Sequence, residues 1–383
     1  MRFPEFSGEW KEEQLDSIAT LSKGVGISKE QLSEVGEPCI LYGELYTKYK
    51  SEIIKQIESK TDIDCSKLKR SKANDVIIPC SGETAVDIAT ARCVPFDNIL
   101  FGGDLNVISL HKYDGAFMSY QLNGKRKYDI ARVAQGVSVV HLYGDHLKAI
   151  KTYNPTLPEQ QKIAKLLSLL DERIATQNKI IEDLNKLKSA IIEMEYTHKT
   201  KGNTHIGDFI EQTSKRNKDS AIQNVLSVSN SQGFIQQCEQ FENRSVASDD
   251  ISNYKIVERN CFAFNPARIN VGSIARLTTF NRGIVSPMYI CFRTKDNLFP
   301  EYLDYYFESK QFFTEIQKRL EGSVRQCLSY EGLCNIPLCI PTVEVQQQTG
   351  KRLSTLVQEI KLEIDFLELL QKQKKFLLHQ MFI

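Results

Sequence analysis

The chain has 383 residues, of which 41% are hydrophobic and 25% are charged, a composition typical of a globular protein long enough for two or three domains. The formal net charge is +1. This balance neither indicates nor excludes a nucleic-acid partner, since a basic face can be offset by acidic residues elsewhere. No run of about 18 apolar residues occurs and the first residues contain no apolar signal segment, so we expect a cytoplasmic protein without a membrane span.

The first segment, residues 1–153, has the pattern of a mixed α/β domain. Residues 75–79 read Asp-Val-Ile-Ile-Pro, an apolar run typical of a strand. Asn123-Gly124 is a dipeptide that favours a tight hairpin turn. Such a turn would present Lys125, Arg126 and Lys127 on a loop.

A long helix is predicted for residues 154–200. Pro155 and Thr156 suit a helix start, and no proline or glycine follows between Glu159 and Lys201. Apolar residues then recur in alternating steps of four and three, the spacing of a coiled-coil seam. An amphipathic helix packed on a globular core is the alternative, but a length of about 40 residues favours a coiled coil. The seam comprises Ile163, Leu167, Leu170, Ile174, Ile181, Leu184 and Ile191, with polar interruptions at Gln177 and Lys188.

The second half of the chain follows the same plan. Residues 201–339 form a second variable segment, in which residues 288–292 (Met-Tyr-Ile-Cys-Phe) predict a strand, so this domain is also mixed α/β. Residues 340–383 form a second helix that starts after Pro341 and contains only Gly350 as a potential breaker. Its seam comprises Leu353, Leu356, Ile360, Leu367, Leu370 and Leu377, with polar interruptions at Glu363 and Lys374.

An internal repeat connects the two halves. Residues 134–197 align without a gap with residues 320–383, a shift of 186 positions, and 17 of the 64 positions are identical. Unrelated segments would match at far fewer positions. Upstream of these regions the halves diverge, so the order is variable domain, shared helix, variable domain, shared helix. Two similar scaffolds that carry two different domains indicate two related but distinct binding functions.

Chain reach determines the expected orientation of the helices. The first helix runs nearly 60 Å at about 1.5 Å per residue. About nine residues, reaching only about 30 Å, separate its end near residue 197 from the start of the second domain near residue 206. The second domain therefore begins near the far end of the first helix. The second helix must run back antiparallel to pair with it, which predicts a pseudo-twofold arrangement.

The shared segment resembles a known family. Residues 154–164 read NPTLPEQQKIA, are followed by Leu170-Asp171, and resemble the central conserved region of specificity subunits of type I restriction–modification systems. Segments 2–10 (RFPEFSGEW), 24–29 (GVGISK), 42–49 (YGELYTKY) and 322–330 resemble further parts of that family in the right order. The sequence departs from the pattern at residues 342–347, which read TVEVQQ.

The resemblance implies a non-catalytic subunit with no cofactor of its own. Each variable domain would be a target-recognition domain that reads one half of a bipartite site in double-stranded DNA. Two methyltransferase subunits would grip the helices, two restriction subunits would be optional partners, and no membrane would be involved. The implied division is 1–153 for the first target-recognition domain, 154–200 for the central conserved helix, 201–339 for the second target-recognition domain, and 340–383 for the C-terminal conserved helix.

Candidate DNA-binding residues follow from the chemistry of the two contact types. Base edges are read by Arg, Lys, Asn, Gln and hydroxyl groups, whereas phosphates are contacted by Lys, Arg and Tyr. Each candidate is alternatively a solvated surface group. In the first domain we select Lys23, Ser28, Lys29, Tyr42, Tyr46, Thr47, Lys48, Lys69, Arg70, Lys72, Lys125, Arg126 and Lys127. In the second domain we select Arg268, Asn270, Arg276, Arg282, Ser323, Arg325, Gln326 and Tyr330.

The motifs of three enzyme classes are missing. The segments that start at Asn154 and Asn265 lack the second proline and the aromatic residue of an adenine methyltransferase motif, and no P-loop or convincing nuclease motif occurs. The ten cysteines include no Cys-x-x-Cys pair, so we interpret them as small buried residues rather than zinc ligands. A coiled-coil adaptor without DNA binding is the alternative function. A fused methyltransferase–specificity enzyme is disfavoured by the missing motifs.

Overall fold

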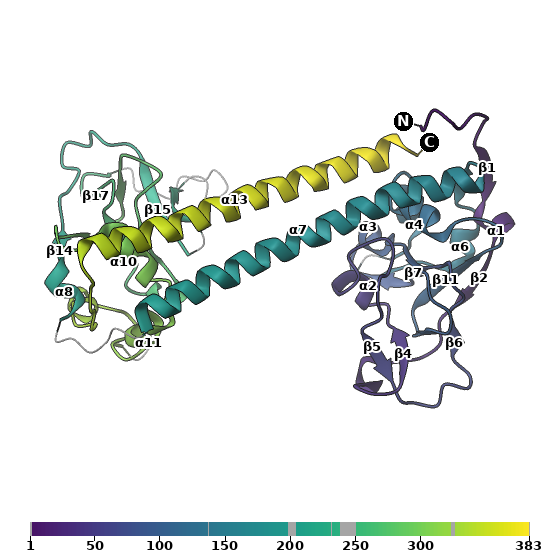
Figure 1. The fold of residues 1–383 in the computed structure, drawn as a ribbon, viewed down its shortest axis with the longest axis horizontal. Coiled ribbons are helices and arrows are strands. Elements are labelled where there is room, and N and C mark those ends of the chain that lie inside the picture. The colour runs from purple at the N-terminus through teal and green to yellow at the C-terminus, as the bar shows by residue number, and fades with distance from the viewer. Residues whose placement is uncertain are drawn as a thin grey trace. The chain divides into compact units, whose positions relative to one another are not determined.

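The protein, for which we use a computed structural model, is described over residues 2–136, 138–197, 204–230, 232–237, 250–322 and 326–382. It divides into two compact units (Figure 1). Unit 1 contains residues Met1–Lys179 and Ile364–Ile383, and unit 2 contains Ile180–Glu363. The two long helices, α7 (Leu157–Thr197) and α13 (Val343–Gln380), each contribute to both units. Within the described ranges, no helix has the length and apolar character needed to span a membrane.

Unit 1 contains two main sheets. The first, with strand order β2-β11-β7-β9, is antiparallel throughout and consists of β2 (Ala19–Lys23), β11 (Leu105–Leu110), β7 (Asp75–Pro79) and β9 (Arg92–Val94). The second, with order β3-β5-β4-β10-β6, consists of β3 (Leu32–Ser33), β5 (Ser59–Thr61), β4 (Glu37–Ile40), β10 (Leu100–Phe101) and β6 (Lys69–Arg70). Two small pairs join β1 (Lys11–Gln14) to β13 (Lys151–Asn154) and β8 (Ser81–Gly82) to β12 (Val140–His141).

Short helices cover these sheets. They are α1 (Leu15–Ile18), α2 (Glu44–Thr47), α3 (Ala85–Ile88), α4 (Gly115–Asn123), α5 (Lys127–Val133) and α6 (Gly144–Lys148), with a 3-10 turn η1 (Lys29–Gln31). The strand predicted at residues 75–79 is confirmed as β7, and all five of its residues are buried. The hairpin predicted at Asn123-Gly124 is wrong. Gly124 instead caps the C-terminus of α4, where its backbone N–H donates to the Tyr120 carbonyl, and α5 follows at once.

Unit 2 is built from the same kinds of sheet. Its first sheet, with order β14-β21-β18-β19, consists of β14 (Ile210–Thr213), β21 (Ile290–Thr294), β18 (Phe262–Phe264) and β19 (Ile274–Arg276). Its second, with order β16-β15-β20-β17, consists of β16 (Gly233–Gln236), β15 (Val225–Ser229), β20 (Arg282–Val285) and β17 (Lys255–Glu258). Its short helices are α8 (Ile206–Phe209), η2 (Ile269–Val271), α10 (Pro300–Tyr306), α11 (Lys310–Gln317) and α12 (Tyr330–Cys334). The strand predicted at residues 288–292 starts two residues late, as β21.

The sheets of the two units correspond strand for strand. In chain order, β2, β4, β5, β6, β7, β9, β10 and β11 match β14 to β21, and the matched strands have the same neighbours. Each second sheet has one parallel pair at its centre, β4 with β10 and β15 with β20. The strand β3 is an addition of unit 1. The repeat seen in sequence only around the helices therefore extends to both domains, and the predicted mixed α/β fold with an internal repeat is confirmed.

A small hairpin ahead of each long helix repeats as well. Gln135 and His141 exchange two backbone hydrogen bonds of 2.9 and 2.7 Å. Glu321 and Cys327, each 186 positions later, exchange bonds of 2.9 and 2.8 Å. We name each hairpin by its paired residues, the unit 1 hairpin by Gln135 and His141 and the unit 2 hairpin by Glu321 and Cys327.

A glycine opens each hairpin for a steric reason. Gly136 has φ +120° and Gly322 has φ +109°, values that residues with a side chain rarely adopt. A Cβ atom at Gly136 would also lie 2.1 Å from the carbonyl oxygen of Val139. The identity of these two positions in the repeat therefore reflects backbone geometry.

One glutamine fixes the start of each long helix on the domain that precedes it. Gln160 accepts from the backbone N–H of Asp114 at 2.9 Å and donates to the Pro155 carbonyl at 2.8 Å. Its repeat counterpart, Gln346, accepts from the N–H of Phe299 at 2.8 Å and donates to the Pro341 carbonyl at 2.9 Å. Both glutamines are almost fully buried. These bonds satisfy buried polar groups that would otherwise cost about 1–3 kcal/mol each.

The predicted seam positions of both helices are all buried or half-buried. In unit 1, Ile163 and Leu167 at the start of α7 share a hydrophobic cluster with Phe117, and with Met381 and Phe382 at the end of the chain. The start of α7 therefore lies beside the end of α13, so the two helices run antiparallel there, as predicted.

Candidate nucleic-acid interface

A pocket of about 650 Å³ lies in unit 1 where three segments meet. The segments are the loop and helix around α2, the stretch from β8 to α3, and the unit 1 hairpin. The lining residues are Tyr42, Gly43, Tyr46, Thr47, Ser81, Gly82, Glu83, Asp87, Ser138 and Val139. Three of the predicted DNA-binding residues, Tyr42, Tyr46 and Thr47, are thus brought together on one surface.

Tyr46 forms a fixed part of this pocket. Its hydroxyl donates to the carbonyl of Ser81 at 3.0 Å. A Cβ atom on Gly82 would lie 2.9 Å from that hydroxyl oxygen, so the glycine permits the close approach. Burial raises the pKa of Tyr46, which keeps the phenol neutral at physiological pH. Tyr42, by contrast, is 39% exposed and is available to a ligand.

The charged side chains that line this pocket are both acidic, namely Glu83 and Asp87. Asp87 is held at the start of α3, because Thr84 donates its hydroxyl to the carboxylate at 2.6 Å and accepts from the Asp87 N–H at 3.1 Å. Carboxylates repel phosphates but accept hydrogen bonds from the amino group of cytosine. These acids were not among the predicted residues, which were limited to cations, amides and hydroxyl groups.

A second pocket, in unit 2, has the opposite charge. Its volume is about 680 Å³, and four of its lining residues are cationic: Lys215, Arg216, Lys218 and Arg282. One carboxylate, that of Asp219, also lines it. Such a surface suits phosphate groups, which basic residues neutralise on DNA. Arg282 was predicted, whereas the run Lys215-Arg216-Asn217-Lys218 just after β14 was visible in the sequence but was not selected.

Two predicted cations of unit 1 have internal partners. Arg70 forms a bidentate ion pair with Glu37, in which two guanidinium nitrogens lie 2.5 and 2.9 Å from the two carboxylate oxygens. Lys48 lies 2.7 Å from both a Glu44 carboxylate oxygen and the Ser59 hydroxyl. These contacts offset part of the positive charge that the sequence suggested for the surface.

The basic stretch 125–127 lies at the junction of α4 and α5 rather than on a hairpin. Arg126 pairs with Asp129 at 3.3 Å and lies over the ring of Tyr153, 5.1 Å from its centroid. Lys127 is half-buried, and burial lowers its pKa. Lys125 is also half-buried.

The remaining candidates of unit 1 differ in their surroundings. Lys69 is half-buried on β6, and Lys23 lies 5.8 Å from the centroid of the Tyr143 ring. The side chains that are exposed to solvent are those of Lys23, Ser28, Lys29 and Lys72.

In unit 2, Arg276 is the predicted residue most engaged inside the protein. It contacts Asp304 at 3.0 Å, Glu301 at 3.4 Å and Asn260 at 3.1 Å. Tyr330 is half-buried at the start of α12. The exposed candidates are Arg268, Asn270, Arg282 and Gln326. Ser323 and Arg325 lie outside the described residues.

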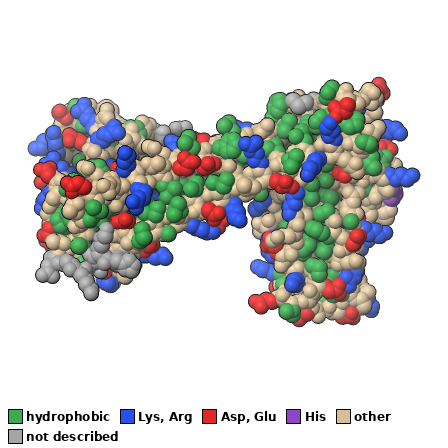
Figure 2. All heavy atoms as spheres, in the orientation of Figure 1, with side chains coloured by type: hydrophobic (Ala, Val, Ile, Leu, Met, Phe, Trp, Pro, Cys, Tyr) green, Lys and Arg blue, Asp and Glu red, His purple; other side chains and the backbone are tan. Residues whose placement is uncertain are grey.

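Basic and acidic side chains are mixed over the surface of both units on the face shown in Figure 2. This mixture matches the formal net charge of +1. The face shown in Figure 2 is therefore not uniformly basic.

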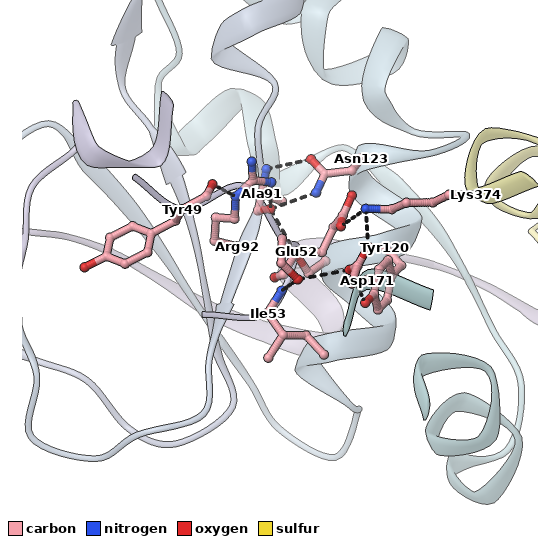
Figure 3. A network of polar contacts seen from close by, with 11 residues as sticks. Tyr49, Glu52, Ile53, Ala91, Arg92, Tyr120, Asn123, Asp171 and Lys374 are labelled. Atoms are coloured by element: carbon pink, nitrogen blue, oxygen red, sulfur yellow. Dashed lines mark hydrogen bonds and ion pairs between the residues drawn. The ribbon is translucent and has the colours of Figure 1, made fainter. Parts of the chain in front are cut away.

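A buried charged network in unit 1 has a structural role. Lys374 of α13 contacts Glu52 at 2.5 Å and Asp171 of α7 at 2.6 Å (Figure 3). Asp171 also accepts from the Tyr120 hydroxyl at 2.7 Å and the Ser51 hydroxyl at 3.0 Å. Burial opposes the charge on Lys374, but the two carboxylates outweigh it and raise its pKa. Burial raises the pKa of Glu52.

This network joins α7 and α13 to the first domain. Its members are linked to one another, and Glu52 and Asp171 are almost fully buried. They therefore do not face a substrate. Across the described part of the chain, no three His, Cys, Asp or Glu side chains are grouped so that they could hold a metal ion.

Comparison with known proteins agrees with the fold. Residues 7–186 match the type I restriction modification DNA specificity domain. The type I restriction enzyme MjaVIII specificity subunit of Methanocaldococcus jannaschii is 24% identical over 337 residues, covering 79% of this chain and 76% of that protein.

Two solved structures are similar over nearly the whole chain. The S subunit of a type I restriction–modification system from M. genitalium superposes with a TM-score of 0.62 at 17% identity, covering 100% of this chain and 99% of that one. A chain from a structural study of complex assembly and conformational transition of the type I R-M system gives a TM-score of 0.57 at 13% identity, covering 98% and 97%. At these identities the likeness shows a shared fold.

Proposed function

Because the chain belongs to the specificity subunits of type I restriction–modification systems, we propose that each of its two variable domains reads one half of a bipartite site in double-stranded DNA. The family is non-catalytic and acts with DNA and with modification and restriction subunits. On this proposal the chain confers specificity on a partner adenine methyltransferase, to which the methyl donor binds.

The observation that carries the proposal is the strand-for-strand match of the two domains combined with their unlike surfaces. Eight strands correspond in order and pairing. The pocket of unit 1 is acidic and rich in tyrosine, whereas that of unit 2 is basic. One scaffold that carries two different binding surfaces is the arrangement expected for two different half-sites. An adaptor that does not bind DNA, the alternative function, is not favoured by the family.

The proposed division of labour follows the sequence boundaries. Residues 1–153 and 201–339 act as the two target-recognition domains, and residues 154–200 and 340–383 act as the helices that set the spacer. Two methyltransferase subunits would bind the helices, with two restriction subunits as further partners. Exposed apolar side chains on the helices, including Leu166, Leu169, Ile180, Leu187 and Phe366, support a docking role.

The test is to express the chain with its methyltransferase in a host that lacks the system and to sequence the methylated adenines. We expect one motif made of two specific half-sites around a non-specific spacer. A continuous motif would contradict the proposal, as would purified complex that shows no DNA affinity. Affinity should also fall steeply between about 50 and 200 mM salt if several phosphates are neutralised.

A paired insertion tests the role of the helices. Four residues added after Gln177 and four after Glu363 lengthen each helix by about 6 Å. Because B-DNA rises about 3.4 Å per base pair, the spacer should grow by one or two base pairs while both half-sites stay the same. An unchanged spacer in an active complex would show that the helices do not set it.

A further inference from the structure

The internal repeat identifies equivalent segments in the two domains. The N–H of Leu142, at the exit of the unit 1 hairpin, donates to the carbonyl of Cys80 at 2.8 Å. The N–H of Leu328, at the exit of the unit 2 hairpin, donates to the carbonyl of Pro266 at 3.0 Å. Both members of the second pair lie 186 positions after their counterparts. Cys80 directly follows β7, and Pro266 comes two residues after the end of the corresponding strand β18. Residues 81–87 and 267–271 therefore leave equivalent points of the scaffold, each beside its hairpin.

These equivalent segments carry opposite hydrogen-bonding groups. Residues 81–87 expose the carboxylates of Glu83 and Asp87. Residues 267–271 expose Arg268 and Asn270. The first segment therefore offers acceptors, whereas Arg268 in the second offers only donors.

The backbone that carries Arg268 is held by hydrogen bonds, while the Arg268 side chain is exposed. The Arg268 N–H donates to the Asn265 carbonyl at 3.0 Å, and the Arg268 carbonyl accepts from the Ser273 N–H at 3.1 Å. Within the described ranges, neither the Arg268 guanidinium nor the Glu83 carboxylate has an internal hydrogen bond or ion pair. A fixed backbone reduces the entropy lost when such a side chain binds a ligand.

We propose that these two segments determine one base in each half-site and that their opposite chemistry selects different bases. This inference rests on the proposed function. In the first half-site, Glu83 accepts from the exocyclic amino group of cytosine or adenine, with Asp87 beside it. In the second half-site, Arg268 donates to the O6 and N7 atoms of guanine, the pairing that its forked geometry favours in the major groove.

In the first half-site, the choice of a base rather than a phosphate follows from charge. Two exposed carboxylates beside a phosphate would repel it, and the described residues that line the pocket include no lysine or arginine. A base that lacks an amino group at the same position would leave the carboxylates facing acceptors only. The segment therefore excludes some bases as well as selecting others.

The test uses the complete complex of this chain with its methyltransferase. The variants are the Glu83→Gln, Asp87→Asn double substitution and the single substitution Arg268→Gln. Exposed residues outside both segments supply matched controls, Glu34→Gln in unit 1 and Arg259→Gln in unit 2. Thermal melting of each variant confirms that the fold is retained. The readout is base preference at every position of the methylated motif.

In the acidic double variant, we expect the preference for the correct base at one position of the first half-site to fall by about tenfold or more. The base preferences of the second half-site should stay unchanged. Arg268→Gln should relax one guanine of the second half-site and leave the first unchanged. The controls should keep the motif. Unchanged motifs in both folded variants would overturn the inference, as would uniform loss of methylation. If the wild-type complex gave no bipartite motif, the proposed function itself would fail.

Discussion

Replacing Lys374 by Met tests the buried network of unit 1. The substitution leaves Glu52 and Asp171 as two almost fully buried carboxylates without their cation. Removing one partner of a buried ion pair costs about 3–5 kcal/mol, because the remaining charge stays desolvated. In a unit of this size, each kcal/mol lowers the melting temperature by about 2–4 °C. We expect a fall on the order of 10 °C in the transition of unit 1, measured by calorimetry and urea unfolding.

The internal repeat supplies a matched control, Lys188→Met. Lys188 lies 186 positions earlier and pairs with Glu308 at 2.6 Å, but the Glu308 side chain is 47% exposed. Exposed pairs contribute about 1 kcal/mol or less, so this variant should melt close to the wild type. Equal and small losses for both variants would refute the view that burial gives the Lys374 network its importance.

A pH series checks the cause. Burial already raises the pKa of Glu52, and removing Lys374 takes away the nearby cation that opposes this rise. The folded variant then binds more protons than the unfolded chain, so its stability falls as pH rises through the carboxyl range. The loss of unfolding free energy in Lys374→Met, relative to the wild type, should be larger at pH 8 than at pH 5. Adding Glu52→Gln and Asp171→Asn to Lys374→Met should recover part of the loss at pH 8, and a deficit independent of pH would show that lost packing is responsible.

Three further outcomes are expected. Phe382→Ala should lower the free energy of unfolding of unit 1 by about 3–5 kcal/mol, measured by urea unfolding. The reason is that the Phe382 ring packs against Trp10 and Phe117, with ring centroids 6.4 and 5.3 Å away. An unchanged urea midpoint would show that this packing does not stabilise unit 1. Gly136→Ala should lower the free energy of unfolding by about 2 kcal/mol or more, because Gly136 has φ +120° and a Cβ atom there would meet the Val139 carbonyl. The control Gly26→Ala, where a Cβ atom would have nothing within 4 Å, should melt like the wild type. Equal melting temperatures for the two variants would contradict the steric argument. Replacing Lys215, Lys218 and Arg282 together by Gln should weaken binding to all DNA sequences and flatten its salt dependence without changing the methylated motif, and a changed motif would assign the basic pocket to base recognition.

Strands and helix faces that depend on the local spacing of apolar residues could be predicted from the sequence. The apolar run at 75–79 becomes a fully buried strand, and the residues at the predicted seam positions are buried or half-buried, because burial imposes a period that depends on neighbours in sequence. Asn123-Gly124 was misinterpreted, since a glycine suits both a hairpin turn and a helix C-terminus. The helix before it decides between the two, and no single dipeptide contains that information.

The candidate interface was less accessible because it depends on distant partners. Tyr42 and Tyr46 are near each other in sequence and were selected, but Ser81, Glu83 and Ser138 reach the same pocket from elsewhere in the chain. The correspondence of the eight strands also escaped detection. Pairing order is kept by the backbone, whereas the side chains of the two domains have diverged.

The division of each long helix between two units has a consequence for the order of synthesis. Unit 2 is continuous from Ile180 to Glu363, whereas unit 1 needs residues from Ile364 onward. The core around Phe117 gains Phe382, and Glu52 gains its cation Lys374, only after these residues have left the ribosome, later than all of unit 2. A nascent chain that grows at about 5–20 residues per second therefore completes its later domain first. The domain that is translated first waits, with buried carboxylates unneutralised, for the final turns of the C-terminal helix.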